Sequence, residues 1–162
     1  GMSPRLFQEV RERRGLCYAI YAFATGLSDS GLFTIHAAGG PDRAHELFAV
    51  IRDELVKAAE SGFRADEIAR VKAQLKMGLL AALESSSARA EQLARHVLIH
   101  GRPLSTAELV QKVEAVEAAD LQALLARMLA SPLSLATVGP ILNVARFDAV
   151  AEKFTVPASK AA

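Results

Sequence analysis

The chain has 162 residues, of which 51% are hydrophobic and 23% are charged, as expected for a single domain with a substantial core. Its 19 basic and 18 acidic side chains leave a net charge of +1 without a concentrated basic patch, which excludes nucleic-acid binding. The sequence shows no membrane span and no signal peptide, so we expect a soluble chain, cytoplasmic or periplasmic. The single cysteine, Cys17, excludes an internal disulfide and is expected to be buried and inert.

The first forty residues predict a helix followed by a β-hairpin. Ser3 and Pro4 suit the start of a helix, and Gly15 can take the left-handed conformation that ends it. Residues 16–25 and 32–38 are rich in aromatic and β-branched side chains and flank a turn-forming stretch, which is typical of an antiparallel hairpin. Both faces of this hairpin carry apolar side chains, so we expect both faces to be covered.

Helical periodicity dominates the middle of the chain and predicts five helices. They lie near residues 42–62, 65–84, 88–100, from 105 onward, and 119–130. Ser105 and Glu108 have the spacing of a capping box at the start of the fourth helix. Residues 133–139 read as a third strand, and residues 143–153 as a last short helix.

This order of elements predicts the α+β class, with a small antiparallel sheet and helices packed on one face. We expect one domain over residues 1–156 and a disordered tail over 157–162. Three strands are few for so many helices. Either another chain completes the sheet, or a strand that precedes residue 1 is missing.

The histidines do not form a recognisable metal site. A zinc peptidase needs two histidines on one helical face and a glutamate that activates water, but neither HExxH nor HxxEH occurs in the sequence. His45 and Glu46 match the first two residues of HExxH, but Ala49 occupies the position of the second histidine. His96 and His100 have the i, i+4 spacing that can bind a metal, but no carboxylate between them could act as a base. We therefore expect them to lie at the end of a helix, where a histidine can interact with the last carbonyl groups. His36 is expected to be an ordinary strand residue. We therefore predict no metal and no cofactor in this chain.

Several segments nevertheless resemble the C-terminal half of the insulinase-like (M16, processing-peptidase-like) zinc peptidases. The most specific segment is RLFQEVRERRGLCY at residues 5–18. Weaker matches are SGLF at 30–33, KAQLK at 72–76, LESSSAR at 83–89, HGRP at 100–103 and VGP at 138–140. The resemblance covers nearly the whole chain and implies a truncated half-domain of that fold, which lacks its opening strand and helix.

The resemblance also implies a site. In this family two related halves enclose a peptide, the N-terminal half holds zinc through HxxEH, and the C-terminal half supplies an arginine and a tyrosine. The matching positions are Arg11 and Tyr18. The resemblance implies that Tyr18 donates to the oxyanion of the reacting carbonyl, and that Arg11 holds the same oxygen or a substrate carbonyl. The structural alternative is a core tyrosine and a solvated helix arginine.

Three functions remain open. The chain is the Arg/Tyr-bearing part of a peptidase that cleaves peptides, with zinc in a missing half or partner subunit; this reading is favoured because both Arg11 and Tyr18 are present. It is alternatively a non-catalytic structural or partner subunit of the same family. Without the resemblance, it is an α+β domain that self-associates. We expect the isolated chain to be inactive and to form a homo-oligomer.

Overall fold

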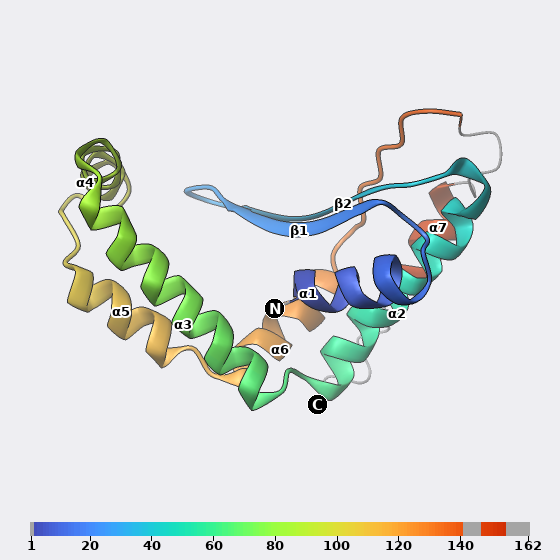
Figure 1. Ribbon diagram of the computed structural model, residues 1–162, viewed down its shortest axis with the longest axis horizontal. Helices are drawn as coiled ribbons and strands as arrows, with labels where there is room; N and C mark the ends of the chain where they lie inside the picture. Colours follow the sequence, from blue (N-terminus) through green and yellow to red (C-terminus); the bar gives the residue numbers. More distant parts are fainter. Residues whose placement is uncertain (1, 141–146, 155–162) are drawn as a thin grey trace. The chain divides into compact units, whose positions relative to one another are not determined.

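The computed structural model describes residues 2–140 and 147–154, so the predicted boundary at residue 156 and the predicted tail lie outside the described residues. The described chain forms two compact units. One unit contains the part of the chain up to Gly62 together with the part from Leu121 onward, and the other contains residues 63–120. The element types agree with the predicted α+β class, because helices accompany a small antiparallel sheet (Figure 1).

The first unit begins with a continuous helical segment. Helix α1 (Met2–Leu6) runs directly into the π-helical segment η1 (Phe7–Arg13), and both pack against strand β1 (Ala19–Gly26). The side chains of Leu6 and Val10 are completely buried. The predicted cap at Ser3 was wrong, because the helix already includes Met2 and Ser3 therefore lies inside it. Gly15 ends the segment with φ of +58°, as predicted.

Strands β1 and β2 (Gly31–Ala38) form the predicted antiparallel hairpin, in register from Ala19 opposite Ala38 to Gly26 opposite Gly31. Only one face is well covered. Ile20 is buried, whereas Tyr21, Phe23 and Leu32 on the opposite face are exposed. The expectation that both faces are covered is therefore wrong for the described residues, since α1 and η1 reach β1 from one side only.

A third strand was also predicted, over residues 133–139, but the structure has irregular backbone there. The sheet in the described part of the chain has two strands. A strand is stabilised by the ladder it forms with a neighbour, and this run pairs with neither β1 nor β2. Val138 is fully exposed, as expected for an apolar side chain in an unpaired segment. The residues just after it, 141–146, lie outside the described part of the chain.

In addition to α1, three helices of the described chain lie wholly or mainly in the first unit. A short 3₁₀ turn, η2 (Pro41–Arg43), leads into α2 (Ala44–Ser61), and α6 (Ala118–Leu129) and α7 (Phe147–Phe154) follow later in the chain. The buried side chains of α2 lie on one face and are Leu47, Val50, Ile51, Leu55 and Ala58. Helix α7 packs against α2. Residues 143–146 of the helix predicted over 143–153 lie outside the described residues.

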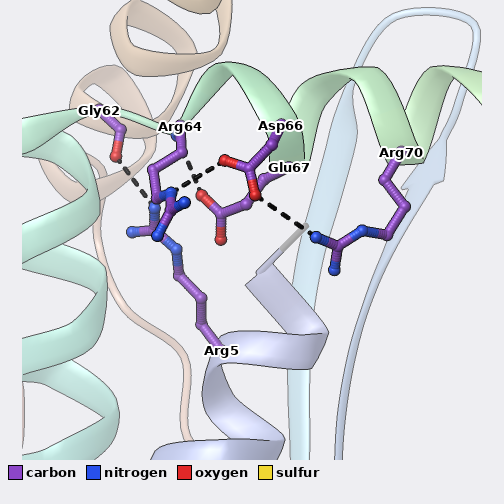
Figure 2. A network of polar contacts seen from close by, with 6 residues as sticks. All are labelled: Arg5, Gly62, Arg64, Asp66, Glu67 and Arg70. Carbon is purple, nitrogen blue, oxygen red and sulfur yellow. Dashed lines mark hydrogen bonds and ion pairs between the residues drawn. The ribbon is translucent and has the colours of Figure 1, made fainter.

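Polar side chains satisfy the last carbonyl groups of α2. Gln122 Nε2 donates to the carbonyl oxygens of Ala59 at 2.7 Å and Glu60 at 3.0 Å. Gly62 has φ of +70°, and its carbonyl accepts a long bond of 3.4 Å from Arg5 Nη2 (Figure 2). The last turn of a helix has no intrahelical donors for its carbonyls, so these contacts stabilise the end of α2.

The second unit contains α3 (Ala65–Ala81), the 3₁₀ turn η3 (Ala82–Glu84), α4 (Ser86–His100) and α5 (Thr106–Ala115). Helices α3 and α5 lie side by side (Figure 1). Glu114 on α5 pairs with both Lys72 and Lys76 of α3, which lowers the pKa of the Glu114 carboxyl, mainly through its hydrogen bond with Lys76. This charge cluster joins two helices that have no buried side chains of their own.

The helices of the second unit have capped N-termini. At the start of α3 the Arg64 backbone donates to Glu67 at 3.0 Å, and Asp66 pairs with Arg64 at 2.9 Å and Arg70 at 3.5 Å (Figure 2). At α5 the Glu108 N–H donates to Ser105 Oγ at 3.1 Å, which confirms Ser105 as the predicted cap. The Glu108 carboxylate instead binds Arg102 through two bonds, of 2.9 and 2.8 Å.

In the described residues, no helix is both long enough and apolar enough to span a membrane.

Candidate functional site

Arg11 lies in the last turn of η1, with its side chain 44% exposed. Its guanidinium carbon is 4.7 Å from the centre of the Phe7 ring, a cation–π contact, and its Nε is 3.9 Å from the Glu12 carboxylate. Both contacts come from the same short segment and leave much of the guanidinium open to solvent. π-Helical turns are often found at functional sites, because they change the direction of one side chain within an otherwise regular helix.

Tyr18 lies at the entrance to the hairpin and is 72% exposed. Its backbone is fixed by the two buried residues before it and by a hydrogen bond to strand β2. Leu16 and Cys17, which precede it, are buried, and its own N–H donates to the Ala38 carbonyl at 2.9 Å. The Tyr18 phenol is therefore an exposed group on a fixed backbone, which is unlike a core tyrosine.

The turn between Arg11 and Tyr18 is stabilised by backbone hydrogen bonds. The Gly15 N–H donates to the Arg11 carbonyl at 3.1 Å, and the Leu16 N–H donates to the Val10 carbonyl at 2.9 Å. These bonds turn the chain from the helix into the strand within a few residues. In the described structure the side chains of Arg11 and Tyr18 form no hydrogen bond with each other, although the turn places both at the same end of the hairpin.

Two further residues support this turn, and the sequence analysis missed both of their roles. Arg43 Nη1 donates to the Arg14 carbonyl at 3.0 Å, while Glu46 accepts from the same guanidinium at 3.0 Å. Gly39 packs so closely that an added Cβ would lie 2.6 Å from the Leu16 carbonyl oxygen. The sequence showed Gly39 only as part of a turn, because a close approach between distant segments leaves no local signal.

Cys17 is buried, as predicted. Burial raises the pKa of its thiol, because the thiolate is poorly solvated there, and the nearby positive charge of Arg11 partly opposes this rise. The Cys17 side chain therefore reports on both the packing of the turn and the charge of Arg11.

We expect the Cys17 thiol to react with a disulfide reagent such as DTNB at pH 8 at least about tenfold more slowly in the folded chain than in urea. Replacing Arg11 by glutamine should slow the folded-state reaction further, because removing the positive charge raises the thiol pKa and lowers the thiolate fraction. Arg13→Gln is the matched control, since Arg13 pairs with Glu9. Equal rates in folded and unfolded chains would contradict this account.

Three of the four histidines, His36, His45 and His96, lie in different local environments. His36 lies on β2 and stacks on Tyr21, with ring centres 4.8 Å apart. His45 lines a small cavity between α2 and α7. His96 is buried, and its Nδ1 accepts from the Leu104 N–H at 3.2 Å. A neutral imidazole that accepts at Nδ1 carries its proton on Nε2, so His96 offers no free lone pair to a metal.

This contact makes His96 a structural cap for the residues that follow α4. We expect His96→Ala to destabilise the second unit by about 1–3 kcal/mol, because the buried Leu104 N–H loses its acceptor. Chemical unfolding followed by circular dichroism would measure the loss. His100→Ala, at an exposed position on the same helix, should have a much smaller effect; equal effects would show that the Nδ1 contact is unimportant.

Zinc binding requires a set of deprotonated nitrogen, sulfur or carboxylate ligands around one point. Residues 2–140 and 147–154 contain no cluster of three or more His, Cys, Asp or Glu side chains that could hold a metal. The donor groups in the described structure therefore do not fit a zinc ion. The exposed groups at the site are a guanidinium and a phenol, which can donate hydrogen bonds to a negatively charged oxygen.

The chain is similar to known proteins over most of its length. Residues 1–75 match the family model described as "Peptidase M16 inactive domain". The chain is 36% identical over 141 residues to an uncharacterized zinc protease of Streptomyces coelicolor, covering 87% of this chain and 31% of that protein. The chain thus spans about a third of the length of the curated relatives it matches.

Solved structures share the fold. A chain of complex III2 from Candida albicans, bound to Inz-5, superposes with a TM-score of 0.80 at 21% identity, covering 94% of this chain and 36% of that one. A peptidase M16 inactive domain from Pseudomonas fluorescens superposes with a TM-score of 0.61 at 22% identity, covering 74% of this chain and 28% of that one.

Proposed function

This chain is a C-terminal domain of the insulinase-like M16 peptidase family, and we propose that it forms the Arg/Tyr-bearing part of a zinc-dependent peptidase that cleaves peptides. In this proposal the chain binds substrate and stabilises the transition state but does not hold the metal. The observation that carries it is the position of Tyr18, an exposed phenol on a backbone fixed by buried neighbours and a strand hydrogen bond.

The proposed chemistry follows from where charge develops during peptide hydrolysis. Attack on the scissile carbonyl places negative charge on its oxygen, and fixed donors that bind this oxygen more tightly as the charge grows lower the barrier. Tyr18 donates its hydroxyl to this oxyanion. Arg11 binds the same oxygen or a neighbouring substrate carbonyl through its exposed guanidinium.

Zinc belongs to a different part of the enzyme in this proposal, either another half of the same protein or a partner subunit with an HxxEH motif. We expect the purified chain to hold no stoichiometric zinc and to cleave no quenched fluorescent peptide. Addition of an HxxEH-bearing partner should produce cleavage that depends on Tyr18, which is tested with Tyr18→Phe. Metal-dependent cleavage by the isolated chain would overturn the proposal.

A non-catalytic role as a structural or partner subunit is the second candidate. It is supported by the matching family model, which describes an inactive domain, and by the largely uncovered hairpin. The two candidates differ in one measurable way. A structural subunit would support its partner's activity equally well with Tyr18→Phe, whereas the first proposal requires a large loss.

We also propose that the isolated chain forms a homo-oligomer through its sheet. The outer edges of β1 and β2 have no further strand beside them in the described residues, and neither strand contains a proline or any Asp, Glu, Lys or Arg. Such edges pair readily with other strands. Light scattering should therefore show a dimer or larger species that Thr25→Lys weakens and the turn variant Ser28→Lys does not. A monomer at all concentrations would contradict this.

A further inference from the structure

The turn that carries Arg11 and Tyr18 is held by a side chain from another element. We propose that Arg43 is a positioning residue of the proposed site, which fixes the Arg11 end of this turn so that the Arg11 guanidinium keeps its place beside the substrate. The inference rests on the proposed function and adds a residue to it. Arg43 touches no reacting atom and acts through the backbone of Arg14 and Gly15.

Glu46 fixes the orientation of the Arg43 guanidinium. Arg43 directly precedes α2, and Glu46 lies in the first turn of that helix, where a negative charge is favourable. The Arg43 Nε and Nη2 donate to the same Glu46 carboxylate oxygen, at 3.2 and 3.0 Å. This fork occupies one edge of the planar guanidinium and leaves the remaining nitrogen, Nη1, for a third partner.

That third partner is the backbone of the turn. Arg43 Nη1 donates to the Arg14 carbonyl oxygen at 3.0 Å, across 29 residues of sequence. The peptide group that contains this carbonyl also contains the Gly15 N–H, which donates to the Arg11 carbonyl at 3.1 Å. A peptide group is planar and rigid, so a bond at its oxygen and a bond at its N–H fix it at both ends. Arg43 is thus connected to the backbone of Arg11 through a single rigid group.

The Arg43 contact is one of three between the turn and the segment that leads into α2. At the other end of the turn, the Tyr18 N–H donates to the Ala38 carbonyl at 2.9 Å. Between these two contacts, an added Cβ on Gly39 would lie 2.6 Å from a backbone oxygen of the turn. Ala38 and Gly39 therefore hold the Tyr18 end and the middle, whereas Arg43 holds the end next to Arg11. Loss of the Arg43 side chain affects Arg11 more than Tyr18.

The Arg43 contact adds little stability, so its effect lies in geometry. The side chains of Arg43 and Glu46 are 48% and 46% exposed, and exposed ion pairs contribute little because water and salt screen them. A donor to a substrate oxygen, however, must be held to within about 0.5 Å of its productive position. A contact that restrains the backbone next to such a donor therefore changes the reaction more than it changes the stability of the fold.

The first test follows the turn in the isolated chain, by NMR hydrogen exchange of single backbone amides. Arg43→Ala frees one end of the peptide group before Gly15, so we expect the Gly15 amide to exchange about three- to tenfold faster. The Tyr18 amide should exchange at an unchanged rate, and Tm should fall by less than about 3 °C. Lys57→Ala, which removes an exposed ion pair with Glu54 on α2, is the control and should change neither amide.

The second test measures cleavage of a quenched peptide by the chain assembled with an HxxEH-bearing partner. Arg43→Ala should lower kcat/KM by about three- to thirtyfold, and by less than Arg11→Gln does. In a chain that already carries Arg11→Gln, Arg43→Ala should change kcat/KM by less than about twofold, because no guanidinium is left to position. Arg43→Lys, which keeps a donor for the carbonyl, should recover part of the loss, and Glu46→Ala should reproduce part of it.

Three results would overturn the inference. They are an equal loss from Arg43→Ala with and without Arg11, an unchanged exchange rate at Gly15, and a general loss of amide protection in the first unit, which would make Arg43 a structural residue only. The proposed function fails separately. If Tyr18→Phe and Arg11→Gln both leave cleavage unchanged, the proposed function is wrong, whereas full activity of Arg43→Ala beside an impaired Arg11→Gln removes only the present inference.

Discussion

Replacing Tyr18 by phenylalanine is expected to lower kcat by about 10²–10³-fold in an assembly of this chain with an HxxEH-bearing partner. That is the usual effect of removing one donor to a developing oxyanion. The substitution removes one hydroxyl from a side chain that is 72% exposed, so it should leave the fold and the stability unchanged. KM should change little, because in the proposed function the Tyr18 hydrogen bond strengthens only in the transition state.

Two matched variants separate this effect from general damage. Ser30→Ala removes an exposed hydroxyl from the tip of the same hairpin and should leave kcat unchanged. Arg11→Gln should reduce kcat/KM, whereas Arg13→Gln, at the end of the same helical segment, should not. If Tyr18→Phe retains full kcat, the chain acts as a structural partner, and the second candidate function is correct.

Replacing Gly39 by alanine is expected to destabilise the first unit by about 1–3 kcal/mol, the usual cost of overpacking. The new Cβ would lie 2.6 Å from the Leu16 carbonyl oxygen and 3.2 Å from the Cys17 Cα. Both atoms belong to backbone, so the whole segment must shift, and that segment carries Tyr18. We therefore expect a loss of catalytic activity in the assembled enzyme as well as a lower Tm.

Gly40→Ala is the control for this prediction, because a Cβ at Gly40 meets nothing within 4 Å and its φ of −70° is allowed for any residue. The chain has no tryptophan, and its two tyrosines are Tyr18 and Tyr21. Intrinsic tyrosine fluorescence therefore reports on the hairpin during urea unfolding. If Gly39→Ala unfolds at the same urea concentration as Gly40→Ala, the close approach to Leu16 is tolerated and the segment is not rigid.

Much of the local structure could be predicted because it depends on neighbouring residues. Gly15 ends the first helical segment because its left-handed conformation suits glycine. Ser105 caps α5 because its hydroxyl reaches the free N–H three residues later. The hairpin register follows from two strand-like runs separated by a short turn. The choice of Arg11 and Tyr18 as site residues came from the resemblance of residues 5–18 to the peptidase family and remains a prediction.

Other features could not be predicted because they depend on segments that are distant in the sequence. Residues 133–139 have a strand-like composition, yet in the described structure they pair with neither strand of the hairpin and form no strand. The role of Gly39 appears only when it meets Leu16, and the role of His96 appears only when it accepts from Leu104. Composition showed apolar side chains on both faces of the hairpin, but only the packing decided which face is buried.

The sequence by itself thus determined the helix end at Gly15, the cap at Ser105, the hairpin and the absence of an HxxEH or HExxH motif, since these depend on residue types at fixed short spacings. The tertiary structure alone decided that Tyr18 is exposed beside a buried Leu16 and Cys17, and that Tyr21 and Phe23 are exposed in the described part of the chain. The physical reason is that burial depends on which distant elements pack together, and a strand with apolar residues on both faces has no local signal that distinguishes its covered face from its open one.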